Sequence, residues 1–215
     1  MDRHKSISLA DQIFERLETD ILIGKYAQGD VLTENQLSEN LGVSRTPIRE
    51  ALRRLQQEKL VADSSRGVVV LGISLEDIKD IYAIRIPIEK MALERFIATL
   101  TDEKLRKLKD IIDVQEFYGN RKDAEHITYQ DNEFHETIYE NCGSVIIGET
   151  LINLHRKVVK YRKASIENSS RAEKSIGEHK AIYEAIAAKD VESAVKLLIE
   201  HIKNAENSIL NGGNK

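Results

Sequence analysis

The feature of this sequence that most constrains its fold is a change of pattern near residue 72. Up to that point the chain holds short helical segments and then the only convincing strand signal, Val68 to Leu71. From Ser74 onward, apolar residues recur with helical spacing in long stretches separated by brief polar turns. Because an amphipathic helix must bury its apolar face against another element, such a series predicts a helical bundle. We therefore expect a mostly α protein with two domains, residues 1–72 and 75–212.

The first 72 residues predict three helices and a small β-hairpin, the arrangement of a winged helix-turn-helix. An apolar residue recurs at every fourth position from Leu9 to Ile21, which gives the first helix one apolar face. Thr33 opens a capping-box pattern for a short second helix. A glycine turn follows, and Ser44 is placed to cap the third helix. A polar turn inside residues 60–71 separates two apolar runs, which is typical of a hairpin.

The third predicted helix carries side chains suited to DNA, because the second helix of a helix-turn-helix enters the major groove. Arg45, Arg49 and Arg53 recur every four residues and form one basic stripe. Arginine can form two hydrogen bonds to guanine or to phosphate. Hydroxyl groups at the helix start can donate to phosphates, and the basic hairpin tip can follow the backbone into the minor groove. The residues predicted to contact DNA are Ser44, Arg45, Thr46, Arg49, Arg53, Arg66 and Gly67.

Overall charge does not point to nucleic acid, since the formal net charge is −4. The signal is local, with six basic residues against three acidic ones between Arg45 and Arg66. A solvated helix face often carries three arginines, so the stripe alone leaves a structural interpretation open. The short turn, the N-terminal position and the basic hairpin together favour DNA binding.

The stretch from Leu37 to Leu52, which contains Ser-Arg-Thr-Pro and Arg-Glu-Ala-Leu, resembles the signature of the GntR family of bacterial repressors. The resemblance covers about the first 72 residues. It implies that Arg45, Arg49 and the wing glycine region contact DNA. A further arginine is common in the family where this chain has Asn35, so part of the operator preference is expected to differ.

Four residues of the C-terminal part have the spacing of a metal site. Asp131 and His135 lie four positions apart on one predicted helix and so share a face. His179 and His201 lie 11 residues before and after Asp190, where the last two helices meet. At about 1.5 Å per residue each is about 16 Å from that turn, so the two come level in an antiparallel hairpin. A lone interior histidine is more often a hydrogen-bonded core residue, and both interpretations stay open. The other histidines lack such partners and are predicted to be surface or structural residues: His4, His126 and His155.

Residues from Leu75 to about Leu210 resemble the FCD effector domain of the FadR branch of GntR regulators. The matching residues are Arg85, Glu89, the run 131–135, Glu178-His179 and His201. The resemblance implies a divalent transition metal on Asp131, His135, His179 and His201, with zinc the first choice and nickel, manganese or iron as alternatives. Pro87 is not typical of the family pattern, and it predicts a kink near residues 83–86.

Arg85 has two interpretations. It can pair with Glu89 one helical turn later, or it can project into the bundle and bind the carboxylate of an effector held by the metal.

These features predict a DNA-binding transcriptional regulator, most simply a repressor, that acts as a homodimer on double-stranded operator DNA and responds to a small carboxylate metabolite. Two alternatives are a regulator whose signal is the metal itself and a metalloenzyme, although the sequence has no HExxH motif, nucleophile pairing or phosphate loop. No apolar run could span a bilayer, and a single cysteine excludes an internal disulfide. We therefore expect a bacterial cytoplasmic, nucleoid-associated protein without a membrane partner.

Overall fold

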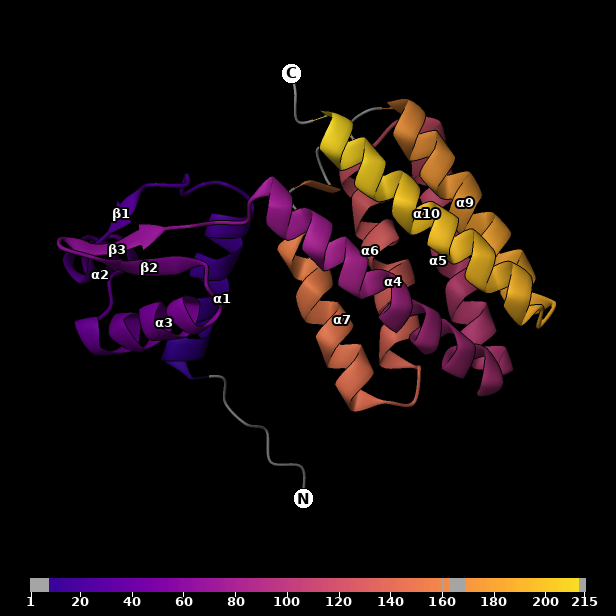
Figure 1. Cartoon of the computed structure of the whole chain (residues 1–215), viewed down its shortest axis with the longest axis horizontal. Helices are drawn as coiled ribbons and strands as arrows, with labels where there is room; N and C mark the ends of the chain where they lie inside the picture. Colours follow the sequence, from indigo (N-terminus) through magenta and orange to yellow (C-terminus); the bar gives the residue numbers. More distant parts are fainter. Residues whose placement is uncertain (1–7, 160, 163–168, 213–215) are drawn as a thin grey trace. The chain divides into compact units, whose positions relative to one another are not determined.

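The computed structural model describes residues 8–159, 161–162 and 169–212, and it divides the chain between Ser74 and Leu75 into two units (Figure 1). The division lies close to the expected domain boundary. No helix in the described ranges is long and apolar enough to cross a membrane.

The N-terminal unit contains three helices and a three-stranded antiparallel sheet of order β1-β3-β2. The elements are α1 (Leu9–Leu22), β1 (Val31–Leu32), α2 (Glu34–Leu41), α3 (Arg45–Gln57), β2 (Val61–Ser64) and β3 (Gly67–Val70). The predicted hairpin is present as β2 and β3, but β1 was not expected. It pairs Val31 with Val69 and Leu32 with Val68, and two residues are too few to show a strand period.

The core of this unit lies between α1, α3 and the sheet, and it is made from the apolar face of each element. Leu17 of α1, Ile48 and Leu55 of α3, and Leu60 before β2 are fully buried. Ser8 caps α1 through Asp11, and Thr33 caps α2 by accepting from Gln36 N–H. The sequence pattern thus folds as predicted, with the charged face of α3 turned away from the core.

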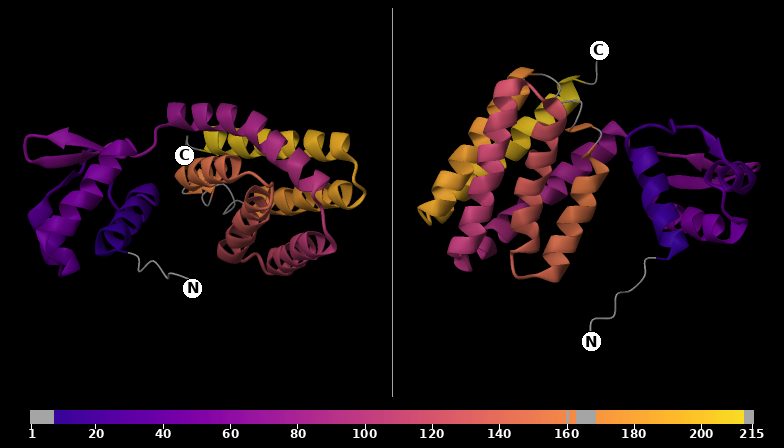
Figure 2. Two further views of the ribbon diagram at one scale, coloured as in Figure 1. Left: turned by 90° about the horizontal axis from the view of Figure 1, so that it is seen from below. Right: turned by 180° about the vertical axis from the view of Figure 1, so that it is seen from behind.

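The C-terminal unit is a bundle of helices (Figures 1 and 2). Its described helices are α4 (Leu75–Ala98), α5 (Asp102–Arg121), α6 (Ala124–Glu140), α7 (Val145–Lys157), α9 (Ser169–Ala187) and α10 (Val191–Gly212). α9 and α10 form an antiparallel hairpin, α4 packs on α10 and α7, and α5 packs on α6 and α9. The two units together confirm the predicted fold class, a winged helix-turn-helix followed by a helical bundle.

Two details of the bundle differ from expectation or extend it. α6 begins at Ala124, well before Asp131, because Asp123 caps it by accepting from His126 N–H. α4 continues through Pro87 and bends along its course, as Figure 2 shows. A proline removes one backbone hydrogen bond without ending a helix whose two ends are held by packing.

Candidate nucleic-acid interface and metal centre

The recognition helix α3 separates its apolar and basic residues onto different faces. Ile48, Leu52 and Leu55 are buried, whereas the stripe Arg45, Arg49 and Arg53 is exposed. Gly42 ends α2 in the left-handed conformation, at φ 66°, which makes the tight turn between the two helices. Ser44 is the N-cap of α3, but its hydroxyl accepts no capping hydrogen bond. This exposed hydroxyl, that of Thr46 and the free N–H groups of the helix start are therefore available to phosphate.

The start of α2 holds two of these arginines in place. Arg49 donates to both carboxylate oxygens of Glu34, at 2.7 and 2.8 Å, and Arg45 donates to Oδ1 of Asn35 at 3.1 Å. The hydrogen bonds from Arg49 lower the pKa of Glu34. Asn35, the position where the family pattern has an arginine, thus contacts a neighbouring arginine of the predicted interface.

The wing tip is pressed against β1. Gly67 has φ 145°, and a Cβ atom on it would lie 2.3 Å from the carbonyl oxygen of Leu32. Only glycine fits there without displacing backbone. Arg66, the preceding residue, is exposed, so the tight turn presents a basic side chain beside the helix-turn-helix.

In the second unit, the four residues predicted as metal ligands come together from three helices. Asp131 and His135 lie on α6, His179 on α9 and His201 on α10, and all four are buried. One ligand atom from each lies within 4.8 Å of the others. The Nε2 atom of His201 is 3.1 Å from that of His135 and 3.3 Å from that of His179. Oδ1 of Asp131 lies 3.4 Å from Nε2 of His179.

The other nitrogen of each ring faces an oxygen. Nδ1 of His201 lies 2.7 Å from Glu178, Nδ1 of His179 lies 3.0 Å from Oε1 of Gln115, and Nδ1 of His135 lies 3.4 Å from Glu89. Because the Gln115 and Glu178 oxygens accept, we assign the ring proton to Nδ1 in His179 and His201, and we assign it likewise in His135, whose Nδ1 faces the Glu89 carboxylate without a hydrogen bond. Their Nε2 lone pairs then converge on one point. Metal-binding histidines are oriented by oxygen partners in this way.

Burial lowers the pKa of His179 and of His201 well below 6.5, and the neighbouring histidines lower it further. Both rings are thus neutral at pH 7, and two lone pairs 3.3 Å apart cannot form a hydrogen bond with each other. A cation between them would remove this repulsion. Ligand atoms on a tetrahedral zinc ion lie about 3.3 Å apart, given metal–ligand bonds of about 2.0–2.1 Å. The donor set therefore fits a divalent transition metal.

Arg85 pairs with Glu89, as one of the two interpretations expects, and its side chain is buried inside the bundle. Its Nε and Nη2 each lie 2.8 Å from Oε1 of Glu89, yet the side chain is only 2% exposed and points into the bundle. Its Nη1 has no hydrogen-bond partner among the described residues. Tyr139 and His155 also lie near this guanidinium, with their polar atoms 3.5 and 3.3 Å from Nη2.

His155 was predicted to be a surface or structural residue, and the structure buries it next to the cluster. The ring is fully buried beside His135, with 5.4 Å between the ring centroids. Its Nε2 lies 2.9 Å from Oδ1 of Asn132, while Nδ1 faces the guanidinium groups of Arg85 and Arg162. Burial and then Arg85 lower the pKa of His155 well below 6.5. Of the other two histidines, His126 is exposed as expected and stacks on Tyr118, and His4 lies outside the described residues.

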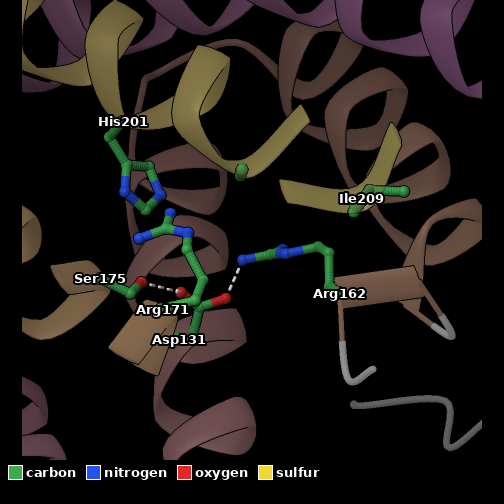
Figure 3. A pocket seen from close by; sticks show the side chains of 7 residues that line it. Asp131, Arg162, Arg171, Ser175, His201 and Ile209 are labelled. Carbon is green, nitrogen blue, oxygen red and sulfur yellow. Dashed lines mark hydrogen bonds and ion pairs between the residues drawn. The ribbon is translucent and has the colours of Figure 1, made fainter. Parts of the chain in front are cut away.

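A small pocket opens beside the cluster (Figure 3). Arg162, in the segment between α7 and α9, contacts Oδ2 of Asp131, and Ser175 donates to Oδ1 at 3.1 Å. Arg171 extends toward His201 and pairs with Glu178 at 3.0 Å. Burial lowers the pKa of Arg162 to about 9, so the group is still a cation at neutral pH. The pocket is lined by Asp131, Arg162, Arg171, Ser175, His201, Ala205 and Ile209.

Comparison with known proteins gives two family matches. Residues 9–70 match the bacterial regulatory proteins of the gntR family, and residues 80–204 match the FCD domain. The chain is 29% identical over 195 residues to the uncharacterized HTH-type transcriptional regulator YdhC of Bacillus subtilis (strain 168), covering 90% of this chain and 87% of that one. It is also 29% identical over 198 residues to the gluconate operon transcriptional repressor of Bacillus licheniformis, covering 90% and 82%.

Among solved structures, E. coli McbR/YncC superimposes with a TM-score of 0.82 at 24% identity, covering 97% of this chain and all of that one, which shows a shared fold. The family and the relatives are transcriptional regulators rather than enzymes, so the metalloenzyme alternative is set aside. The chain therefore belongs to the GntR family of DNA-binding bacterial transcriptional regulators and carries an FCD domain in its C-terminal unit.

Proposed function

We propose that this protein is a cytoplasmic repressor whose affinity for operator DNA is controlled by a small carboxylate bound at a metal site in the C-terminal bundle. The observation that carries the proposal is the convergence of three Nε2 atoms and one carboxylate oxygen, with Nδ1 of His179 and of His201 hydrogen-bonded to an oxygen. A histidine buried for structural reasons alone does not need two like partners at lone-pair contact. The repressor role is supported by the gluconate operon repressor among the relatives.

In this proposal Asp131, His135, His179 and His201 hold the metal, zinc being the best fit to the donor set. A divalent ion with these four ligands keeps a positive charge and supplies a Lewis-acidic position for a ligand oxygen. Other residues of the chain orient the ligands and bind the effector. Glu89, Gln115 and Glu178 orient the imidazoles, and the free Nη1 of Arg85 is available to bind the effector carboxylate.

The effector can act only if it favours one arrangement of the DNA-binding units over another, because a ligand with equal affinity for two states shifts neither. We place the dimer contact on α4. Ile84, Pro87 and Met91 form an exposed apolar stripe there, at successive turns of one helix face, and Ile84 and Met91 are 48% and 45% exposed. A homodimer built on this stripe presents two recognition helices to a near-palindromic operator.

The test is a thermal-shift screen of small organic acids on wild-type protein, the Arg85→Ala variant and EDTA-stripped protein. An effector should stabilise the wild type, lose most of that effect in both altered forms, and change affinity for an operator selected from genomic fragments. Neutral hits that are insensitive to metal and to Arg85 would refute the carboxylate mechanism. A response of operator affinity to metal alone, with no acid required, would identify the metal as the signal.

A further inference from the structure

Three buried arginines border the histidine cluster, and each has one carboxylate partner. Arg85, Arg162 and Arg171 are 2%, 5% and 8% exposed. Arg85 pairs with Glu89, Arg162 with Asp131 and Arg171 with Glu178. Without a metal, the three positive charges and three negative charges balance. Buried charges are tolerated in proteins when they are paired in this way.

A divalent ion on the cluster upsets this balance. Ligand histidines are neutral, so Asp131 is the only anion among the four ligands. If its carboxylate coordinates the ion, Arg162 must share that charge with a dication. The cluster and the three arginine pairs then hold an excess of two positive charges among largely buried side chains. Such an excess is costly, and a bound anion relieves it.

Arg162 and Arg85 are positioned to act on one small ligand. Both guanidinium groups contact the ring of His155: Nη2 of Arg85 lies 3.3 Å from Nδ1, and Nη1 of Arg162 contacts both ring nitrogens. Nε2 of the same ring also lies 2.9 Å from Oδ1 of Asn132. One neutral ring therefore spaces the two cations a few ångströms apart. Arg171, from α9, lines the small pocket together with Arg162 (Figure 3).

Building on the proposed function, we propose that the effector carries two acid groups joined by a short carbon chain. One carboxylate lies at the metal and Arg85, and the second is bound by Arg162, with His155 setting the distance between them. The dianion returns the site to neutrality, whereas a monocarboxylate leaves one positive charge unmatched. The chemical class is a short dicarboxylate, with or without a hydroxyl group.

The test compares acids that differ only in the second carboxylate. Zinc-loaded protein is titrated calorimetrically with matched pairs, namely succinate and butyrate, malate and 2-hydroxybutyrate, and glutarate and valerate. We expect at least one dicarboxylate to bind about tenfold or more tightly than its partner, a difference of about 1.4 kcal/mol. In Arg162→Gln that preference should collapse, because the dicarboxylate should lose more affinity than its monocarboxylate partner. Arg162→Lys should restore part of it.

Arg156→Gln is the matched control, since Arg156 is an exposed arginine on α7. It should keep the wild-type preference. Zinc content and circular dichroism of each variant establish that the site is intact before titration. Equal affinity for both members of every pair, or an equal loss for both in Arg162→Gln, would overturn the dianion proposal and leave the carboxylate mechanism standing. If no acid binds the zinc-loaded wild type, the proposed function itself fails.

Discussion

At the scale of single residues, the inward orientation of the Nε2 atoms in the histidine cluster can be tested by substitution. His179→Ala removes one inward Nε2 and leaves Gln115 without its partner. We expect zinc content to fall from about one ion per chain to well below that. The C-terminal unit should melt at a lower temperature, because metal binding stabilises the folded state that holds the site. Atomic absorption and calorimetry measure the two effects.

His126→Ala is the control for this experiment, because His126 is exposed and lies away from the cluster. It should retain both the metal and the melting temperature. Wild-type protein that contains no transition metal after chelator-free purification, and cannot rebind any, would rule out the site.

Arg49 is the arginine at the centre of the exposed stripe on α3, so its removal should have the largest effect on DNA binding. Arg49→Ala should weaken operator binding by about 1–3 kcal/mol per half-site, counted twice in a two-fold dimer. Fluorescence anisotropy with the selected operator measures the loss. Arg16→Ala, an exposed arginine on α1, should bind like wild type. Equal affinity of the Arg49 variant and the wild type would remove Arg49 from the interface.

At this scale the sequence predicts the four clustered residues, because two fixed spacings and a family pattern locate them. It does not place His155, whose partners come from α4 and α6 through packing that no local spacing records. A weaker sequence signal for the burial of His155 was present. His155 shares a helix face with Leu151 and Val158, both buried, and a histidine on an apolar face must find a partner inside.

At the scale of elements, the wing depends on one glycine. Gly67→Ala should destabilise the N-terminal unit by more than the cost of a left-handed alanine, about 1–2 kcal/mol, because its Cβ would overlap the Leu32 carbonyl. Gly42→Ala is a matched control, also at positive φ but with open space around it. Hydrogen exchange of β2 and β3 amides should speed up more in the Gly67 variant than in the Gly42 variant. Equal exchange in the two variants would mean that β1 moves away from the new Cβ atom without a loss of stability.

The apolar stripe on α4 makes a prediction about assembly. Ile84→Glu places a charge in the proposed dimer contact and should shift sedimentation from dimer to monomer at micromolar concentration. Val114→Glu introduces the same charge at an exposed apolar position on α5, and it should leave the dimer intact. A monomeric wild type would refute the homodimer, and a dimeric Ile84 variant would place the contact elsewhere.

Long helices were predictable from sequence because their period repeats over several turns, as in α10. Short or capped elements were not. β1 depends wholly on its pairing with β3, and the first two turns of α6 have less apolar periodicity than the stretch around Phe134. In both cases tertiary contacts or a cap decide what periodicity leaves open.

At the scale of the whole molecule, the buried histidines make stability depend on pH. Burial holds the pKa of His155, His179 and His201 below the ordinary 6.5. Below pH 6.5 the unfolded chain therefore binds more protons than the folded one, and stability falls as pH falls. Each histidine contributes at most about 1.4 kcal/mol per pH unit. Urea unfolding of EDTA-stripped protein at pH 7.5, 6.5 and 5.5 should show this decline.

In the His155→Gln variant the unfolding free energy should fall less steeply with falling pH, by the slope that corresponds to about one proton. An unfolding free energy that is constant or rises between pH 6.5 and 5.5 would contradict the burial of neutral rings. Protons also compete with zinc for the ring nitrogens, so metal affinity should fall as pH falls.

The ion pair between Glu34 and Arg49 has a consequence for how the protein responds to ionic strength. The affinity of a protein for DNA depends on salt through the number of cations that it displaces from the phosphates, about 0.9 per charge neutralised. An arginine that already carries its own carboxylate displaces fewer of them. Operator binding should therefore be less sensitive to salt than the three arginines of α3 imply. It should persist at ionic strengths that dissociate from DNA a recognition helix whose arginines have no carboxylate partner.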